Sequence, residues 1–443
     1  MTSPHGTAAH PAAPGVSRAE LTALIGEIEK EQRVNEAVVN LVPSENRVSP
    51  LASTPLRTDF YNRYFFNDAL DPEFWQFRGG EGVGRLEAEL ALPALRRLGR
   101  AEYVNVRPVS GMSAMLVVLL GLGGDAGDGV VCVDAATGGH YATARQIRML
   151  GRRALEVPFT EGRVEADALR RALGSGRVPL VYLDLQNCLR EPDVAQVAEV
   201  IRETSPETVL HVDCSHTLGL VLGGVHANPL DLGADTMGGS THKTFPGPQK
   251  GVLFTRDEAL ARRMREAQFY TISSHHFAET LALGLAAAEF EHFGAAYARQ
   301  VLVNARTFAA ALRDRGFDVV PGGPHLTDTH QVWVRMAPGE SAGTFSARLA
   351  ALGIRVNVQT ELPGIAEPAL RLGVSEVTLT GGTERTMEAL AEVFALVRAE
   401  ETTKAAELFQ GLPGGLAEPY FFTSRSEGAG FPGSAGEEGV FRG

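Results

Sequence analysis

The sequence has few cysteines and no long apolar segment. Cys132, Cys188 and Cys214 show no spacing typical of a metal site or a redox pair, and their odd number favours reduced thiols in the cytoplasm. No apolar run approaches the ~20 residues that a membrane-spanning helix needs. The first residues, MTSPHGTAAHPAAPG, lack the basic and apolar segments of a secretion signal and read as a disordered arm. We therefore expect a cytoplasmic protein that does not act at a membrane.

An excess of positive charge is also absent. Lys and Arg number 41 against 53 Asp and Glu, which leaves a formal net charge of −12. This balance argues against nucleic acid or an anionic membrane as a partner. The chain is long enough for more than one domain. Its 443 residues, 44% of them hydrophobic, can form a large α/β core and a smaller domain.

One lysine stands in a loop that can continue neither a helix nor a central strand. Lys243 is followed closely by residues 246–248, Pro-Gly-Pro, which break regular structure. Upstream, residues 209–212 read as a buried strand that ends at Asp213, and an acid in that place faces the ligand crevice of an open α/β sheet. A carboxylate can keep a pyridine nitrogen protonated, and a lysine in a pocket can hold an aldehyde cofactor as a Schiff base. Lys243 alone could be a surface lysine, but the pair predicts a pyridoxal 5′-phosphate site.

Several motifs resemble, in content and order, the serine hydroxymethyltransferase family of fold-type I pyridoxal-phosphate enzymes. They are LVPSENRVSP, VRPVSGMSA, TGGHY, HVDCSHTLGL, STHKTFPGPQKG and ALRLGVSEVT, and the resemblance covers roughly residues 20–400. It implies an α/β fold like that of aspartate aminotransferase. We expect a large domain with a mostly parallel sheet and a smaller C-terminal α+β domain.

The resemblance implies the residues that bind the cofactor. Lys243 holds pyridoxal 5′-phosphate, Asp213 meets the pyridine nitrogen, His140 stacks over the ring, and His216 orients it. A Ser-Gly turn at a helix start presents free N–H groups to an anion. The phosphate is therefore assigned to Ser110, Gly111 and Met112. Without the other motifs, this turn would read as a plain helix cap and His140 as a structural histidine.

The resemblance also implies a substrate site. Ser44 and Arg371 hold the α-carboxylate, for which an arginine fork is suited. Tyr64 belongs to a segment that the family contributes to the other subunit's site, so a homodimer, or a tetramer built from it, is expected. The catalytic residues that follow from the resemblance are Lys243, His140, Tyr64 and His216. Asn187, at the end of a predicted strand, is a further residue that could touch the cofactor.

One stretch departs from the family pattern. Counted from the Ser-Glu-Asn motif, the family's tyrosine falls on Tyr64, and the glutamate two residues later falls on Phe66. In the family that glutamate supports folate-dependent transfer of a one-carbon unit, and a phenyl ring neither donates nor accepts a proton. The tyrosine-proline-glycine that usually follows is replaced by a longer loop, residues 67–77. Glu73 belongs to this insertion and does not restore the pattern.

A second departure lies after the lysine loop. The family has a glycine-rich segment that contacts the phosphate from the neighbouring subunit, whereas this chain has YTISSHHFAETLAL, with Ser274, His275 and His276. Two histidines with Glu279 one helical turn later raise the alternative of a metal site. No further His, Cys or acid nearby completes a ligand set, so we predict no metal.

The order of predicted elements gives four segments. Residues 1–45 form an arm and a helix, which begins at Ser17 because Glu20 completes a capping-box spacing. Strands are predicted at residues 179–186, 209–212 and 251–255, with parallel pairing through crossovers. The large cofactor domain spans residues 46–300, the small domain residues 301–400, and an extended tail rich in Gly, Pro and Ser residues 401–443.

These features predict cleavage and formation of the Cα–Cβ bond of β-hydroxy-α-amino acids. Three alternatives compete: a folate-independent L-threonine transaldolase or aldolase of a natural-product pathway, a serine hydroxymethyltransferase, and a non-catalytic regulatory or scaffold protein that retains the cofactor. Intact Asp213, His216, Lys243 and Arg371 argue against the third, and Phe66 with its rebuilt loop favours the first over the second. The substrates would be an amino acid and an aldehyde. A nucleoside aldehyde, an aryl acetaldehyde and fluoroacetaldehyde are the candidate acceptors.

Overall fold

The computed structural model describes residues 15–67, 69–321, 326–412 and 416–422. The predicted amino-terminal arm (residues 1–14) and the end of the predicted tail (residues 423–443) lie outside these ranges. The chain divides into two compact units, residues 1–39 and 40–443.

The first unit contains helix α1 (Arg18–Ala37). The predicted capping box is confirmed, because the Glu20 amide donates to Ser17 Oγ (3.2 Å) and the Ser17 amide donates to Glu20 Oε2 (2.7 Å). None of the residues of α1 is buried. Its exposed apolar side chains include Leu21, Leu24, Ile25 and Ile28, which recur with helical spacing along one stripe.

The second unit contains a seven-stranded sheet in the order β2-β10-β9-β8-β7-β3-β4. Its strands are β2 (Tyr103–Asn105), β3 (Gly129–Val133), β4 (Arg153–Val157), β7 (Leu180–Asp184), β8 (Val209–Asp213), β9 (Thr236–Ser240) and β10 (Gly251–Thr255). The strands predicted near residues 179–186, 209–212 and 251–255 are therefore confirmed. β4, β3, β7, β8 and β9 run parallel, as expected.

β10 differs, because it pairs antiparallel with both β9 and β2. The connection between β9 and β10 consists of residues 241–250, which are too few for a helical crossover. The chain must therefore turn back on itself at the end of β9, and the loop that carries Lys243 is this turn.

Helices surround this sheet. α4 (Gly111–Leu122) supplies much of the core, where its apolar side chains pack against β9, β10 and α9 (Glu258–Phe269). The other helices of this part are α2 (Glu81–Arg85), α3 (Leu92–Gly99), α5 (Thr143–Met149), α6 (Ala166–Leu173), α7 (Val194–Thr204) and α8 (Leu218–Leu222). A small hairpin, β5 (Phe159–Thr160) with β6 (Arg163–Val164), follows β4.

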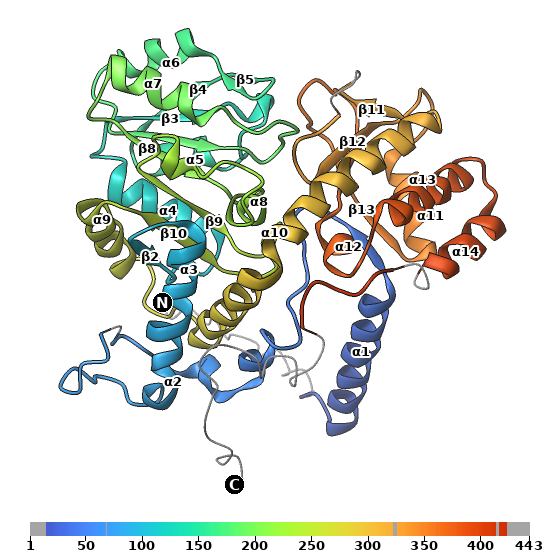
Figure 1. The fold of residues 1–443 in the computed structure, drawn as a ribbon, viewed down its shortest axis with the longest axis horizontal. Helices are drawn as coiled ribbons and strands as arrows, with labels where there is room; N and C mark the ends of the chain where they lie inside the picture. Colours follow the sequence, from blue (N-terminus) through green and yellow to red (C-terminus); the bar gives the residue numbers. More distant parts are fainter. Residues whose placement is uncertain (1–14, 68, 322–325, 413–415, 423–443) are drawn as a thin grey trace, which may run out of the picture. The chain divides into compact units, whose positions relative to one another are not determined.

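A second sheet of five strands has the order β1-β13-β14-β12-β11. Its strands are β1 (Val39–Leu41), β11 (Asp318–Val320), β12 (Gln331–Arg335), β13 (Ile354–Gln359) and β14 (Ala369–Gly373). The accompanying helices are α11 (Ala342–Leu352), α12 (Ser375–Leu379), α13 (Glu384–Arg398) and α14 (Thr402–Gly411). Figure 1 shows α10 (Phe277–Asp314) running between the parts that contain the two sheets.

Two features differ from the sequence-based picture. The small domain was predicted to begin at residue 301, but this point lies inside helix α10, which begins at Phe277 and runs unbroken to Asp314. The domain boundary predicted at residue 300 stays a prediction. The start of the predicted extended tail is helix α14, because TTKAAELF is rich in strong helix formers and the Gly- and Pro-rich stretch begins only after it.

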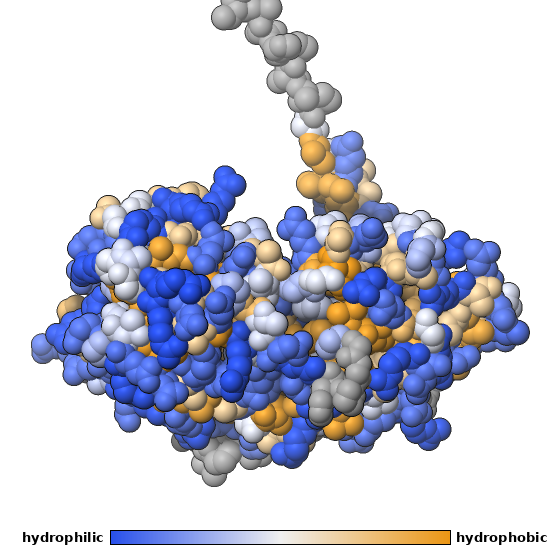
Figure 2. Space-filling view, turned by 90° about the horizontal axis from the view of Figure 1, so that it is seen from above, coloured by the Kyte–Doolittle hydropathy of each residue, from blue (hydrophilic) through white to orange (hydrophobic). Residues whose placement is uncertain are grey.

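Within the described ranges, no helix combines the length and apolar character that crossing a bilayer requires. On the face shown in Figure 2, hydrophilic residues predominate and hydrophobic residues gather in smaller groups between them.

Candidate active site

A cavity of about 200 Å³ opens where the parallel strands end and α4 begins. This is the place at which open α/β sheets bind ligands. Most residues predicted to contact the cofactor, although far apart in sequence, line this one cavity: Ser110, Gly111, Met112, His140, Asp213, His216 and Lys243.

Lys243 lies in the β9–β10 turn with its amine directed at a histidine. Its Nζ is 3.2 Å from His216 Nε2, and its carbonyl accepts a hydrogen bond from Asn46 Nδ2 (2.6 Å). Burial lowers the pKa of Lys243 to about 8, although the nearby Asp213 opposes this shift. A substantial neutral fraction of the amine at neutral pH is what attack on an aldehyde requires.

Asp213 ends β8, and neighbours hold both of its oxygens in place. The Tyr182 hydroxyl donates to Oδ2 (2.6 Å), and the Ser215 amide donates to Oδ1 (2.8 Å). Burial, with Asp213 close by, raises the pKa of Tyr182 well above its usual range, so Tyr182 stays a donor. The carboxylate is therefore fixed in the cavity wall.

The first turn of α4 forms an anion cradle. Ser110 is the N-cap, and its Oγ accepts the Ser113 amide (3.1 Å). Gly111 lies so close to Ser240 that a Cβ would stand 2.6 Å from the Ser240 Oγ, so only glycine fits without a shift. Helix-start amides next to hydroxyl groups suit a phosphate.

Two histidines in the cavity carry no charge at neutral pH. Burial lowers the pKa of His216 well below its usual value, and Lys243 and Arg371 add to this effect. The ring of His216 also stacks on His330, with 5.8 Å between centroids. Burial likewise lowers the pKa of His140. Both rings can therefore lie beside a flat cofactor and accept protons.

Arg371, on β14, lies beside the cavity rather than in its wall. Its Nε donates to Gln331 Oε1 (3.0 Å), and one terminal nitrogen donates to the Gln186 carbonyl (2.5 Å) and lies 3.5 Å from both ring nitrogens of His216. The side chain is 3% exposed, and this burial lowers its pKa to about 9. The guanidinium is held next to Gln186 and His216, which both line the cavity.

Ser44 lies half-buried in a turn tied to the same region. The preceding carbonyl, of Pro43, accepts a hydrogen bond from His330 Nε2 (3.0 Å), and Asn46 reaches the Lys243 carbonyl. The turn is thereby fixed to the Lys243 loop and to the histidine that stacks on His216. Its predicted contact with a substrate carboxylate stays a prediction.

Tyr64 lies outside the cavity of its own chain. Its ring stacks on Phe66 (5.8 Å between centroids) and makes a tilted contact with the ring of Phe77 (5.1 Å between centroids). We call these three residues the Tyr64 cluster. All three side chains are exposed, and the Tyr64 hydroxyl lies 3.2 Å from Ser274 Oγ. Phe66, which stands where the resembled family has a glutamate, thus forms part of an exposed aromatic surface. The role of Tyr64 in the other subunit's site stays a prediction.

The segment at residues 274–276 is anchored by a lysine whose burial the sequence did not reveal. Lys250 is fully buried, and its Nζ donates to the His275 carbonyl (2.8 Å). Burial, with Arg107 nearby, lowers the pKa of Lys250 to about 7. His276 Nδ1 lies 3.2 Å from Glu279 Oε2, but no group of three or more potential metal ligands occurs in the described part of the chain.

A second acid in the cavity was also missed. Asp184 ends β7 in register with Asp213 on β8, and it accepts a hydrogen bond from the Thr143 hydroxyl. An acid at the end of a buried strand was the signal that identified Asp213, so it was available for Asp184 too. Burial raises the pKa of Asp184 to about 8, with Asp213 adding to the effect. Asp184 therefore keeps its proton at pH 7, which sets it apart from the Asp213 carboxyl, whose two oxygens accept hydrogen bonds from Tyr182 and the Ser215 amide.

This difference predicts that Asp184→Asn is tolerated and Asp213→Asn is not. Asparagine resembles a protonated carboxyl, so Asp184→Asn should keep near-normal turnover. Asp213→Asn should lose on the order of 10²–10³ in kcat, because a charge opposite the ring nitrogen disappears.

Asp184 should also make stability depend on pH. Between the unfolded and the folded pKa of this carboxyl, the folded chain holds a proton that the unfolded chain has released. Stability should therefore fall as pH rises through that window, and Asp184→Asn should flatten this fall in thermal melts. Equal losses of turnover in both variants would contradict the assignment.

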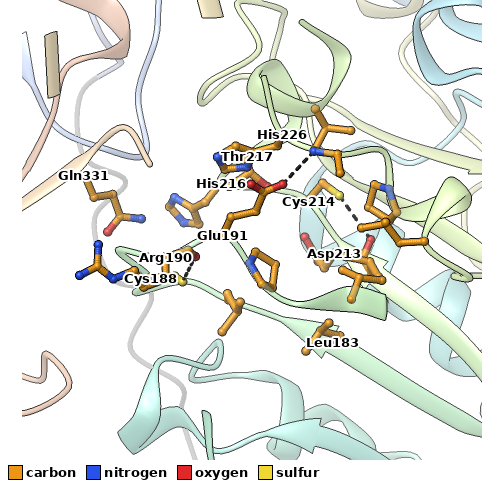
Figure 3. Close-up of a pocket in the computed structure, with 18 residues that line it drawn as sticks. Leu183, Cys188, Arg190, Glu191, Asp213, Cys214, His216, Thr217, His226 and Gln331 are labelled. Atoms are coloured by element: carbon orange, nitrogen blue, oxygen red, sulfur yellow. Dashed lines mark hydrogen bonds between the residues drawn. The ribbon is translucent and has the colours of Figure 1, made fainter. Parts of the chain in front are cut away.

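A smaller cavity of about 30 Å³ lies against Asp213 and His216 (Figure 3). Figure 3 shows Asp213 and Cys214 on one side of it, Arg190 and Cys188 on the other, and His216 between them. Asn187, which could have touched the cofactor, lines neither this cavity nor the larger one, where Gln186 stands instead.

The donor set fits pyridoxal 5′-phosphate. The site offers a desolvated lysine for the aldehyde, a fixed carboxylate for the ring nitrogen, two neutral imidazoles, and a glycine-lined helix start for the phosphate. Substrate binding would then fall to Arg371 and the Ser44 turn. These positions are the ones the chemistry of such a cofactor requires.

Comparisons with known proteins agree with this geometry. The family model described as serine hydroxymethyltransferase matches residues 18–394. An L-threonine:uridine-5′-aldehyde transaldolase of an Amycolatopsis species is 56% identical over 86% of this chain and 92% of its own length. A protein of the same description from a Streptomyces species is 54% identical over 92% of this chain and 99% of its own length. The crystal structure of L-threonine transaldolase from Pseudomonas fluorescens in the internal aldimine state superimposes with a TM-score of 0.81, at 27% identity, over 91% of this chain and 94% of that one.

Proposed function

Since this chain belongs to the serine hydroxymethyltransferase family, we propose that it is a pyridoxal-phosphate-dependent L-threonine transaldolase whose acceptor is a nucleoside 5′-aldehyde. Relatives named for that reaction match more than half of the aligned residues over nearly the whole chain. The observation that carries the proposal is Phe66 in the exposed Tyr64 cluster, at the position where a folate-dependent enzyme needs a proton-handling glutamate, together with a cavity that Lys243, Asp213 and His140 line. Serine hydroxymethyltransferase is the less supported alternative.

The overall reaction exchanges one aldehyde for another. The Cα–Cβ bond of L-threonine breaks, its hydroxyl loses a proton, and its Cβ leaves as acetaldehyde. The same Cα then bonds to the carbonyl carbon of the acceptor, whose oxygen takes up a proton and becomes the new β-hydroxyl. When bound, pyridoxal phosphate supplies the electron sink for the pair of electrons left on Cα.

The side chains have separate tasks in this proposal. Arg371 and Ser44 hold the α-carboxylate, and the rigid partners of Arg371 fix its orientation. Asp213 would face the ring nitrogen, with its two oxygens held by Tyr182 and the Ser215 amide. Lys243 would hold the aldehyde carbon of the cofactor through its amine until the substrate amine takes its place, and His140, whose pKa burial lowers, would accept the hydroxyl proton. His216 orients the ring and the amine.

We also propose a cytoplasmic homodimer in which Tyr64 serves the partner's site. The exposure of the Tyr64 cluster and of the apolar stripe of α1 supports an assembly that covers them. Free, buried cysteines are consistent with a reducing compartment.

The experiment is a comparison of donors and conditions. L-threonine should release acetaldehyde without tetrahydrofolate, and added uridine-5′-aldehyde should give a new β-hydroxy-α-amino acid. L-serine should be the poorer donor. Efficient serine cleavage that strictly needs tetrahydrofolate, with threonine inert, would establish the hydroxymethyltransferase instead.

A further inference from the structure

A separate cavity of about 330 Å³ lies beside the active site and has no role in the chemistry described above. One wall comes from loops that follow β3 and β7 and from the β5–β6 hairpin, including Asn187 and Phe159. The other wall comes from the five-stranded sheet, including Trp333. Its volume is within the range of small-molecule pockets, about 300–1,000 Å³. It is therefore large enough for a ligand in its own right.

This cavity is next to the arginine proposed to hold the amino-acid carboxylate. Trp333 on β12 stands directly opposite Arg371 on β14, and side chains so paired are neighbours on one face of a sheet. Both donate to the same oxygen, Gln331 Oε1, at 3.1 Å from Trp333 Nε1 and 3.0 Å from Arg371 Nε. The small cavity of Figure 3 adjoins both sites, because it shares Cys188 and Arg190 with this one and shares Asp213 and His216 with the cofactor cavity.

Asn187, one of the residues that line this cavity, has an unpaired polar atom within the described part of the chain. Asn187 is 5% exposed, its Oδ1 has no hydrogen-bond partner in the described structure, and its Nδ2 is 3.4 Å from the Glu361 carbonyl. Leaving a buried acceptor without a partner is unfavourable, and Asn187 lines the cavity, so a ligand N–H donor is expected there. Trp333 and Phe159 add flat apolar surfaces, and Glu161 adds a carboxylate.

We propose that this cavity holds the nucleoside part of the acceptor aldehyde, with the imide N–H of a uracil-type base donating to Asn187 Oδ1. The base lies between the aromatic walls, a sugar hydroxyl reaches Glu161, and the 5′-carbon points toward the amino-acid site beside Arg371. This assignment rests on the proposed function, since it names the place where that reaction takes its acceptor. Tyr64 and its cluster are not needed for this contact.

Binding can be tested without turnover, by calorimetry of uridine with the holoenzyme saturated with glycine. Wild type should bind uridine about tenfold more tightly than N3-methyluridine, because methylation removes the donor. In Asn187→Leu the two affinities should become equal. Ala136→Trp, at the rim of the cavity, should abolish uridine binding. Ala347→Trp, on the exposed face of α11, is the matched control and should bind as wild type does.

Turnover measurements provide the second part of the test. In Asn187→Leu, KM for uridine-5′-aldehyde should rise about tenfold relative to threonine cleavage measured in the same preparation. A second result would be that the wild type couples the aldehyde while KM for the aldehyde is unchanged in Asn187→Leu and Ala136→Trp. This result would refute the location of the nucleoside site and leave the proposed function standing. Uridine binding that depends on Asn187, without any coupling of the aldehyde, would instead refute the proposed function.

Discussion

Lys243→Ala should reduce turnover of L-threonine by at least about 10³-fold, because loss of a covalent catalytic group leaves only binding and polar stabilisation. The structure places this amine in the cofactor cavity, 3.2 Å from His216 Nε2, with burial lowering its pKa to about 8. Cofactor can remain bound through the α4 cradle and Asp213, so the variant should keep some pyridoxal phosphate. Borohydride should therefore attach a pyridoxyl group to wild type and not to Lys243→Ala, as seen by absorbance and peptide mapping.

Lys250 is the internal control for this prediction. Its pKa is lowered further, to about 7, yet it is fully buried, donates to the His275 carbonyl and does not line the cavity. Geometry rather than pKa therefore selects Lys243. Lys250→Met, which keeps most of the side-chain length but removes the amine, should still be labelled at Lys243. A pyridoxyl group on Lys250 in the wild-type protein would refute the assignment.

Arg371→Ala should raise KM for L-threonine by about 10²-fold, since each hydrogen bond to a charged group contributes about 1.5–3 kcal/mol and an arginine fork can make two. Lysine should rescue little, because an ammonium cannot reproduce the fork that now also bonds Gln331 and Gln186. Steady-state kinetics with L-threonine would measure both variants.

The control for Arg371 is an amine without a carboxylate. Reactivity of the bound cofactor toward a simple alkylamine should change little in Arg371→Ala, whereas binding of glycine should weaken as much as that of threonine. A fall in kcat alone, with glycine affinity unchanged, would mean that Arg371 acts through His216 rather than on the substrate.

Local sequence signals, taken together with the family resemblance, were sufficient to predict the residues that line the larger cavity. Asp213 ends a short apolar strand, Lys243 lies among residues that break regular structure, and Ser110 opens a helix, so the sequence predicts a strand end, a loop and a helix start for these three residues. Residues whose role depends on packing were different. Lys250 reads as a second loop lysine, and nothing around it in sequence distinguishes a buried amine from a solvated one.

The second cavity could not be predicted for a related reason. It depends on the pairing of β12 with β14, which sets Trp333 opposite Arg371, and on the approach of Asn187 from the other sheet. Strand register across such sequence distances follows from the whole fold and not from any local motif. Asp184 is the opposite case, because it ends β7 as Asp213 ends β8 and the same rule would have found it.

The most direct test of the central claim follows the carbon atoms. L-threonine labelled with ¹³C at Cα is incubated with the holoenzyme and uridine-5′-aldehyde, without tetrahydrofolate, and the products are analysed by NMR and mass spectrometry. A transaldolase places the label at Cα of the nucleoside amino acid and releases unlabelled acetaldehyde in equal amount. Label that stays in threonine, or that appears only in free glycine whatever aldehyde is present, would contradict the account.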